Sequence, residues 1–172
     1  MLAACGGRVA IVWNARTGLR QLVLQGHENR VYSGAWSPDG QWIVTASADM
    51  TARVWSSSTG DCEGELIGHR RIVRSASFSP DGHSIATCSA DGTAKLWSSE
   101  DGSCFQDLKG HGGDVFSAAF SPDSAKVVTG SVDATAKVWD AWSGELLLTL
   151  AGHEGTVRSA VFSLDGRGVL TA

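Results

Sequence analysis

The chain repeats itself every 42 residues. The dipeptide Gly-His occurs at 26–27, 68–69, 110–111 and 152–153, and tryptophan returns at 13, 55, 97 and 139. A tetrapeptide that begins with serine, Ser-Pro-Asp-Gly in its first two copies, starts at 37, 79, 121 and 163 and so keeps the same period. An internal period of this length predicts a row of like units, each of which stacks on its neighbours.

Within each unit, short apolar runs alternate with Gly, Pro, Asp and Ser, which is typical of strands joined by tight turns. In the first complete unit we expect strands at 31–36, 42–47, 51–55 and about 62–67. The 21 glycines and seven tryptophans agree with many turns and large apolar anchors. One four-stranded antiparallel sheet cannot bury both of its faces alone. The sequence therefore predicts an all-β fold in which each repeat forms one blade of a β-propeller.

The spacing of these residues resembles a known family. The Gly-His pair, an aspartate 22 residues after the histidine and a tryptophan six residues further on resemble the tryptophan-aspartate (WD) repeat over essentially the whole chain. Only Trp139-Asp140 is a true Trp-Asp dipeptide, because the other three tryptophans precede asparagine or serine. The resemblance implies a β-propeller scaffold that binds other proteins or peptides and assembles complexes.

We expect a single propeller region over residues 1–172, with a partial blade at 1–25, complete repeats at 26–67, 68–109 and 110–151, and a partial repeat at 152–172. Residues 1–4 and 169–172 share the register of the second strand, so a closed four-bladed ring would have two segments competing for one position. Propellers of the resembled family usually have seven or eight blades. The chain thus resembles part of such a ring, completed by flanking sequence or by a second copy, with closure as a small ring the remaining alternative.

Each complete repeat also contains the residue types of a serine-hydrolase triad. A hydrolase needs one nucleophile on a strained turn beside an oxyanion hole, whereas this chain has three equivalent sets and no Gly-x-Ser-x-Gly turn. The resemblance implies structural tetrads instead, in which the histidine bridges the serine hydroxyl and the aspartate, and the serine reaches the tryptophan indole. The predicted tetrads are His27, Ser47, Asp49, Trp55; His69, Ser89, Asp91, Trp97; and His111, Ser131, Asp133, Trp139. Alternatives are a domain accessory to an enzyme or signalling protein, and a hydrolase that uses one of these sets.

The resemblance also implies where a partner binds, namely on the face that carries the Gly-His loops. The positions are those that flank the first apolar residue of each innermost strand. Arginine and aromatic residues, which contribute strongly to protein interfaces, occupy most of them. The predicted protein-binding residues are Arg30, Tyr32, Ile72, Arg74, Asp114, Phe116, Thr156 and Arg158.

Several classes of function lack support in the sequence. No phosphate-binding loop, dinucleotide fingerprint or His-Glu-x-x-His motif occurs, so we predict no cofactor, no metal site and no catalytic residue. A net charge of −4 argues against nucleic acid, and no apolar run approaches the roughly 20 residues of a membrane span. The four cysteines have no C-x-x-C spacing. They predict reduced thiols and a cytoplasmic or nuclear location.

Overall fold

The computed structural model describes the backbone of residues 2–172 and the side chains from residue 7 onward. Its regular elements are strands in five antiparallel sheets. The first sheet contains β1 (Leu2–Gly6), β2 (Val9–Trp13) and β3 (Arg20–Gln25), and the second contains β4 (Val31–Trp36), β5 (Trp42–Ser47), β6 (Thr51–Ser56) and β7 (Cys62–Ile67). The third contains β8 (Val73–Phe78), β9 (Ser84–Ser89), β10 (Thr93–Ser98) and β11 (Cys104–Lys109), and the fourth contains β12 (Val115–Phe120), β13 (Lys126–Ser131), β14 (Thr135–Asp140) and β15 (Leu146–Ala151). The fifth is the pair β16 (Ala160–Phe162) and β17 (Val169–Thr171).

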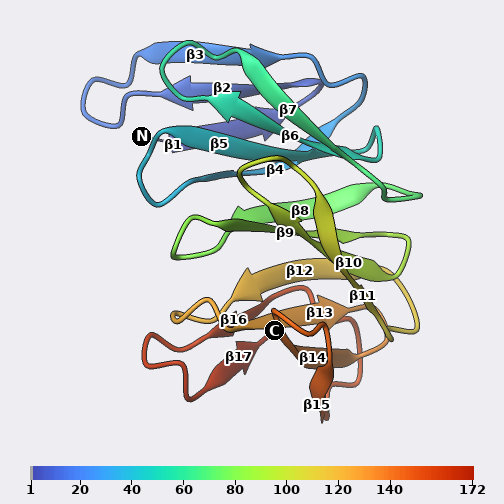
Figure 1. Cartoon of the computed structure of the whole chain (residues 1–172). Coiled ribbons are helices and arrows are strands. Elements are labelled where there is room, and N and C mark those ends of the chain that lie inside the picture. The colour runs from blue at the N-terminus through green and yellow to red at the C-terminus, as the bar shows by residue number, and fades with distance from the viewer. Residues whose placement is uncertain (1) are drawn as a thin grey trace.

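The sheets follow one another in chain order, from the blue N-terminal sheet to the red C-terminal pair (Figure 1). In each complete sheet the strands pair as a simple meander, which is the geometry of a propeller blade. Among residues 2–172, no strand pairing joins the first sheet to the last, and the two lie at opposite ends of the stack. The all-β propeller prediction is confirmed as a partial ring, and closure as a small four-bladed ring is wrong for this structure.

The core lies between sheets rather than within one sheet. Trp97 of β10, for example, packs in one cluster with Val44 of β5 and Leu66 of β7, which belong to the preceding sheet. In β5, every residue from Ile43 to Ser47 is buried, because neighbouring sheets cover both of its faces. The tryptophan of each complete repeat thus anchors one blade against the next.

In the three complete repeats, the glycine of the Gly-His pair makes room for this tryptophan. A Cβ atom on Gly110 would lie 3.2 Å from Cη2 of Trp139, and the same distance applies at Gly26 and Gly68 against their own tryptophans. Around Gly152 nothing lies within 4 Å of such an atom. The glycine therefore allows the indole to approach the loop backbone, and this is a packing requirement of the fold.

Candidate functional site

The predicted histidine, aspartate and tryptophan of each complete repeat meet in one buried network. In the first, His27 Nδ1 lies 2.7 Å from Asp49 Oδ2, and His27 Nε2 lies 2.7 Å from Thr45 Oγ1. Trp55 Nε1–H donates to the same Thr45 oxygen at 2.8 Å. The second network joins His69, Asp91, Thr87 and Trp97, and the third joins His111, Asp133, Thr129 and Trp139, with equivalent bonds of 2.7–2.9 Å.

The assignment of Ser47, Ser89 and Ser131 as the hydroxyl of these networks is wrong. Trp55 pairs with Ile43 across the β5–β6 ladder, so its indole reaches the diagonal neighbour Thr45. Ser47 lies two residues further along β5, where its hydroxyl donates to the Asn29 carbonyl oxygen and accepts the Asp49 N–H, each at 3.2 Å. The serines therefore hold the loop backbone. The signal that sequence reasoning missed is a threonine at 45, 87, 129 and 171, which recurs with the same period.

The titration of these groups sets the direction of every hydrogen bond in the networks. Burial lowers the pKa of His69, more than Asp91 raises it, so the imidazole is neutral. Burial alone would raise the pKa of Asp91, but hydrogen bonds from the Thr93 hydroxyl, the Arg70 N–H and His69 outweigh it and hold the pKa at about 2. The neutral ring therefore donates from Nδ1 to the carboxylate and accepts the threonine O–H at Nε2. The threonine oxygen in turn accepts the indole N–H.

This arrangement resembles a Thr-His-Asp triad, but its hydroxyl is inaccessible. Thr45, Thr87 and Thr129 are each 0% exposed, so a substrate has no route to them. Each network instead joins the Gly-His loop to the second and third strands of its sheet and satisfies four buried polar groups. In the fourth repeat His153 is exposed and keeps the threonine partner, with Nε2 2.7 Å from Thr171 Oγ1.

The structure brings five residues of the predicted protein-binding face into one row. The guanidinium carbon of Arg30 lies 5.5 Å from the centroid of the Tyr32 ring, and that of Arg74 lies 5.6 Å from the same ring. On its other side Arg74 lies 4.9 Å from the centroid of Phe116, and Arg158 lies 5.1 Å from Phe116. These are cation–π distances. We call Arg30, Tyr32, Arg74, Phe116 and Arg158 the arginine–aromatic row, which crosses four successive sheets.

The other three predicted residues lie beside this row with different roles. Asp114 accepts a hydrogen bond from Arg74 Nη2 at 3.0 Å and so neutralises the arginine at the centre of the row. Ile72, before β8, is partly buried, and its carbonyl oxygen accepts the Ala90 N–H at 2.9 Å. Thr156 occupies the equivalent position before β16 and is also partly buried. The row is thus the organised part of the predicted face.

The described residues contain no group of three or more His, Cys, Asp or Glu side chains that could hold a metal ion. In the same part of the chain, no helix has the length and apolar character needed to cross a membrane. Cys62 and Cys104 are exposed free thiols and Cys88 is a buried one, whereas the side chain of Cys5 lies outside the described residues.

Comparison with known proteins gives partial matches to curated relatives. Mouse (Mus musculus) coronin-7 is 45% identical over 38 residues, which are 22% of this chain and 4% of that protein. Human (Homo sapiens) coronin-7 is 43% identical over 42 residues, which are 24% of this chain and 4% of that protein. The chain therefore matches about one repeat of these relatives and a twenty-fifth of their length.

A family model gives the broader match. The model described as WD domain, G-beta repeat matches residues 18–56, 60–98, 102–140 and 144–172. Each of the first three matches begins just before the last strand of one sheet and continues through three strands of the next, so the sequence repeat bridges two blades. With four matches over most of its length, and with the stacked sheets and repeated His-Asp-Trp networks described above, the chain belongs to the WD40 repeat family.

Proposed function

We propose that this protein is a non-catalytic scaffold that assembles complexes by holding protein or peptide partners on the face of its Gly-His loops. The WD40 repeats support the general role of a protein-interaction scaffold. The observation that carries the finer proposal is the arginine–aromatic row, which presents an organised set of contact groups across four sheets.

The row has the properties of an interface hot spot. Stacking against an aromatic ring restrains an arginine, so less side-chain entropy is lost when a partner binds. Tyr32 is 38% exposed and Arg30 and Arg158 are also exposed, so the row is accessible from solvent. Because Asp114 already engages Arg74, the outer arginines carry the positive charge that is available to a partner. A partner segment that offers carboxylates or carbonyl oxygens beside an apolar side chain fits this chemistry.

The non-catalytic part of the proposal rests on accessibility. Ser47, Ser89 and Ser131 are each 0% exposed and donate to backbone carbonyl oxygens, so they are poorly placed as nucleophiles. A hydrolase, or a domain accessory to an enzyme or signalling protein, is the competing function. In our proposal the protein works in the cytoplasm or nucleus, where a reducing environment keeps its cysteines as thiols.

Peptide display tests the binding face. Random peptides would be selected on the wild-type protein, and the affinity of each selected peptide would be measured by fluorescence anisotropy. We expect Phe116→Ala and Arg158→Ala to weaken binding at least tenfold. Arg167→Ala is the matched control, because Arg167 is an exposed arginine in the turn between β16 and β17, outside the row. Selected peptides that bind both row variants as tightly as the parent would place the binding site elsewhere.

Serine-directed labelling tests the competing hydrolase. A fluorophosphonate probe should leave the folded protein unmodified, because the candidate serines are buried. Specific modification of just one of Ser47, Ser89 or Ser131, located by mass spectrometry, would contradict the scaffold proposal.

A further inference from the structure

A second surface, of different chemistry, lies at the opposite ends of the strands from the Gly-His loops. It is formed by the turns between the first and second strands and between the third and fourth strands of neighbouring sheets. A hollow of about 810 Å³ lies there, between the sheet β8–β11 and the sheet β12–β15. Phe105 and Trp142 provide its aromatic lining, and Asp81, Asp123, Asp140 and His83 provide its titratable groups.

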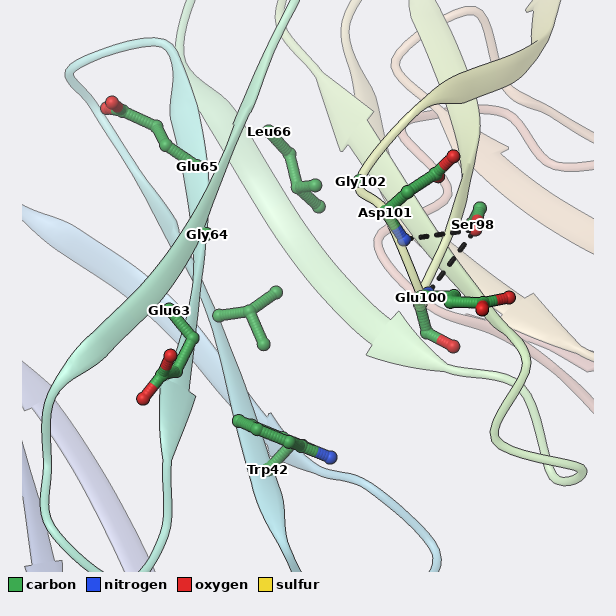
Figure 2. Close-up of a pocket in the computed structure, with 11 residues that line it drawn as sticks. Trp42, Glu63, Gly64, Glu65, Leu66, Ser98, Glu100, Asp101 and Gly102 are labelled. Atoms are coloured by element: carbon green, nitrogen blue, oxygen red, sulfur yellow. Dashed lines mark hydrogen bonds between the residues drawn. The ribbon is translucent and has the colours of Figure 1, made fainter.

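Two smaller hollows, each of about 310 Å³, adjoin this one. One is bounded by Trp42 and by the aspartates of the Ser-Pro-Asp-Gly turns, and it shares Asp81 and His83 with the large hollow. The other lies between β7 and the turn Ser98–Gly102, and Figure 2 shows Trp42 and Leu66 in the space between them. We call the three together the Trp142 groove. Its lining residues come from both sides of two successive junctions, the one between the sheets β4–β7 and β8–β11 and the one between the sheets β8–β11 and β12–β15.

The aromatic side chains of this groove are not required by the repeat. Trp142 is 87% exposed, and the equivalent residues of the two preceding repeats are Ser58 and Glu100. Its backbone is nevertheless held in place, because its N–H donates to Asp140 Oδ1 at 3.0 Å and its carbonyl oxygen accepts from Gln106 Nε2. An ordered backbone that presents a tryptophan to solvent is typical of a binding surface.

The charged side chains that line the groove are acidic. Among the described residues, no lysine or arginine lines any of the three hollows, whereas carboxylates recur in all of them. In the large hollow, Asp123 and Asp140 accept the hydrogen bonds of their own turns through Oδ1, and among the described residues nothing bonds to Oδ2 of either. Asp81 accepts from its own turn in the same way but also interacts with the Ser124 hydroxyl. These turn hydrogen bonds lower the pKa of Asp123 and Asp140, so both are ionised at neutral pH. Lys126 acts on this pair through its charge but does not line the hollow.

We propose that the Trp142 groove binds an extended basic peptide segment of a partner protein. A lysine or arginine side chain would lie against the Trp142 and Phe105 rings, with its cationic end near the free oxygens of Asp123 and Asp140. Such a side chain combines an apolar stem with a charge that both an aromatic face and a carboxylate attract. The groove is remote from the arginine–aromatic row and opposite to it in charge, so a scaffold with both surfaces joins two partners of different chemistry.

A titration followed by NMR tests this proposal with a defined probe. The probe is a blocked ten-residue peptide of alternating lysine and alanine, and its counterpart has glutamate in place of lysine. The indole Nε1–H resonance of Trp142, identified as the one missing from Trp142→Phe, should shift and saturate with the lysine peptide. It should not move with the glutamate peptide. A lysine peptide that leaves this resonance unmoved at millimolar concentration would overturn the proposal, as would an equal response to both peptides.

Variants of the groove test which residues contribute to binding of the lysine peptide. We expect Trp142→Ala and the double variant Asp123→Asn/Asp140→Asn each to weaken binding of the lysine peptide at least fivefold. Glu154→Gln is the matched control, because it removes an exposed carboxylate beside the Gly-His face, and it should bind as the parent does. Equal weakening by Glu154→Gln would indicate attraction to net charge alone and overturn the site. Spermine, a small polycation, should bind more weakly than the peptide, and equal affinity would overturn the choice of a peptide ligand.

Discussion

Replacing Thr87 by valine distinguishes the threonine networks from the serine networks expected from the sequence. Thr87 is 0% exposed, and its Oγ1 lies 2.8 Å from both Trp97 Nε1 and His69 Nε2. Valine keeps the shape of threonine but leaves both nitrogen atoms without a partner. A buried polar group left unpaired costs about 1–3 kcal/mol. We therefore expect the free energy of unfolding to fall by about 2–6 kcal/mol, since two such groups are affected.

The comparison variant is Ser89→Ala, which removes a hydroxyl that bonds only to loop backbone, namely the Arg71 carbonyl oxygen and the Asp91 N–H. These two bonds, of 3.2 and 3.0 Å, are longer than the 2.8 Å bonds of Thr87, so we expect a smaller loss of about 1 kcal/mol. Both variants would be unfolded in urea and followed by tryptophan fluorescence and far-UV circular dichroism. In addition, the indole proton of Trp97 should exchange faster with solvent in Thr87→Val alone. If Ser89→Ala is the more costly change, or if Thr87→Val unfolds like the parent, the threonine assignment fails.

Two further predictions concern the same repeats. Gly110→Ala should lower the free energy of unfolding by about 1–3 kcal/mol more than Gly152→Ala, because only the first places a methyl group 3.2 Å from a tryptophan ring. The two glycines have similar φ values, 151° and 145°, so backbone strain affects both variants alike. Equal losses in urea unfolding would therefore contradict the contact with Trp139. The free energy of unfolding should also fall in two stages on acidification. Below about pH 6.5, His69 takes up a proton in the unfolded chain but resists it in the folded protein, where burial lowers its pKa. Below about pH 3.8, Asp91 is protonated in the unfolded chain, whereas its pKa in the folded protein is about 2. Urea midpoints measured from pH 8 to pH 3 check this, and a midpoint that rises as the pH falls would refute it.

Local patterns were sufficient to predict the strands and the residue types that build the blades. The predicted segments 31–36, 42–47 and 62–67 coincide with β4, β5 and β7, and the third strand is one residue longer than expected. Strand and turn preferences depend on residues close together in the chain, and each of the complete repeats presents them in the same order. The resemblance to the WD repeat, carried by the spacing of Gly-His, aspartate and tryptophan, likewise implied which of these side chains meet, because in each complete repeat the same strand register brings them together.

Two features could be determined only from the tertiary structure: which residue along a strand reaches a given partner, and how side chains of neighbouring sheets pack together. Thr45 and Ser47 recur with one period and lie on the same face of β5, so only the pairing of Ile43 with Trp55 shows which hydroxyl the indole reaches. The residues of the arginine–aromatic row were predicted one by one, but their alternating stack depends on the distance and twist between sheets 42 residues apart in sequence. The Trp142 groove was not predicted at all. Its walls are turns from different repeats, and the space between them exists only because the sheets pack side by side while their turn side chains remain in solvent.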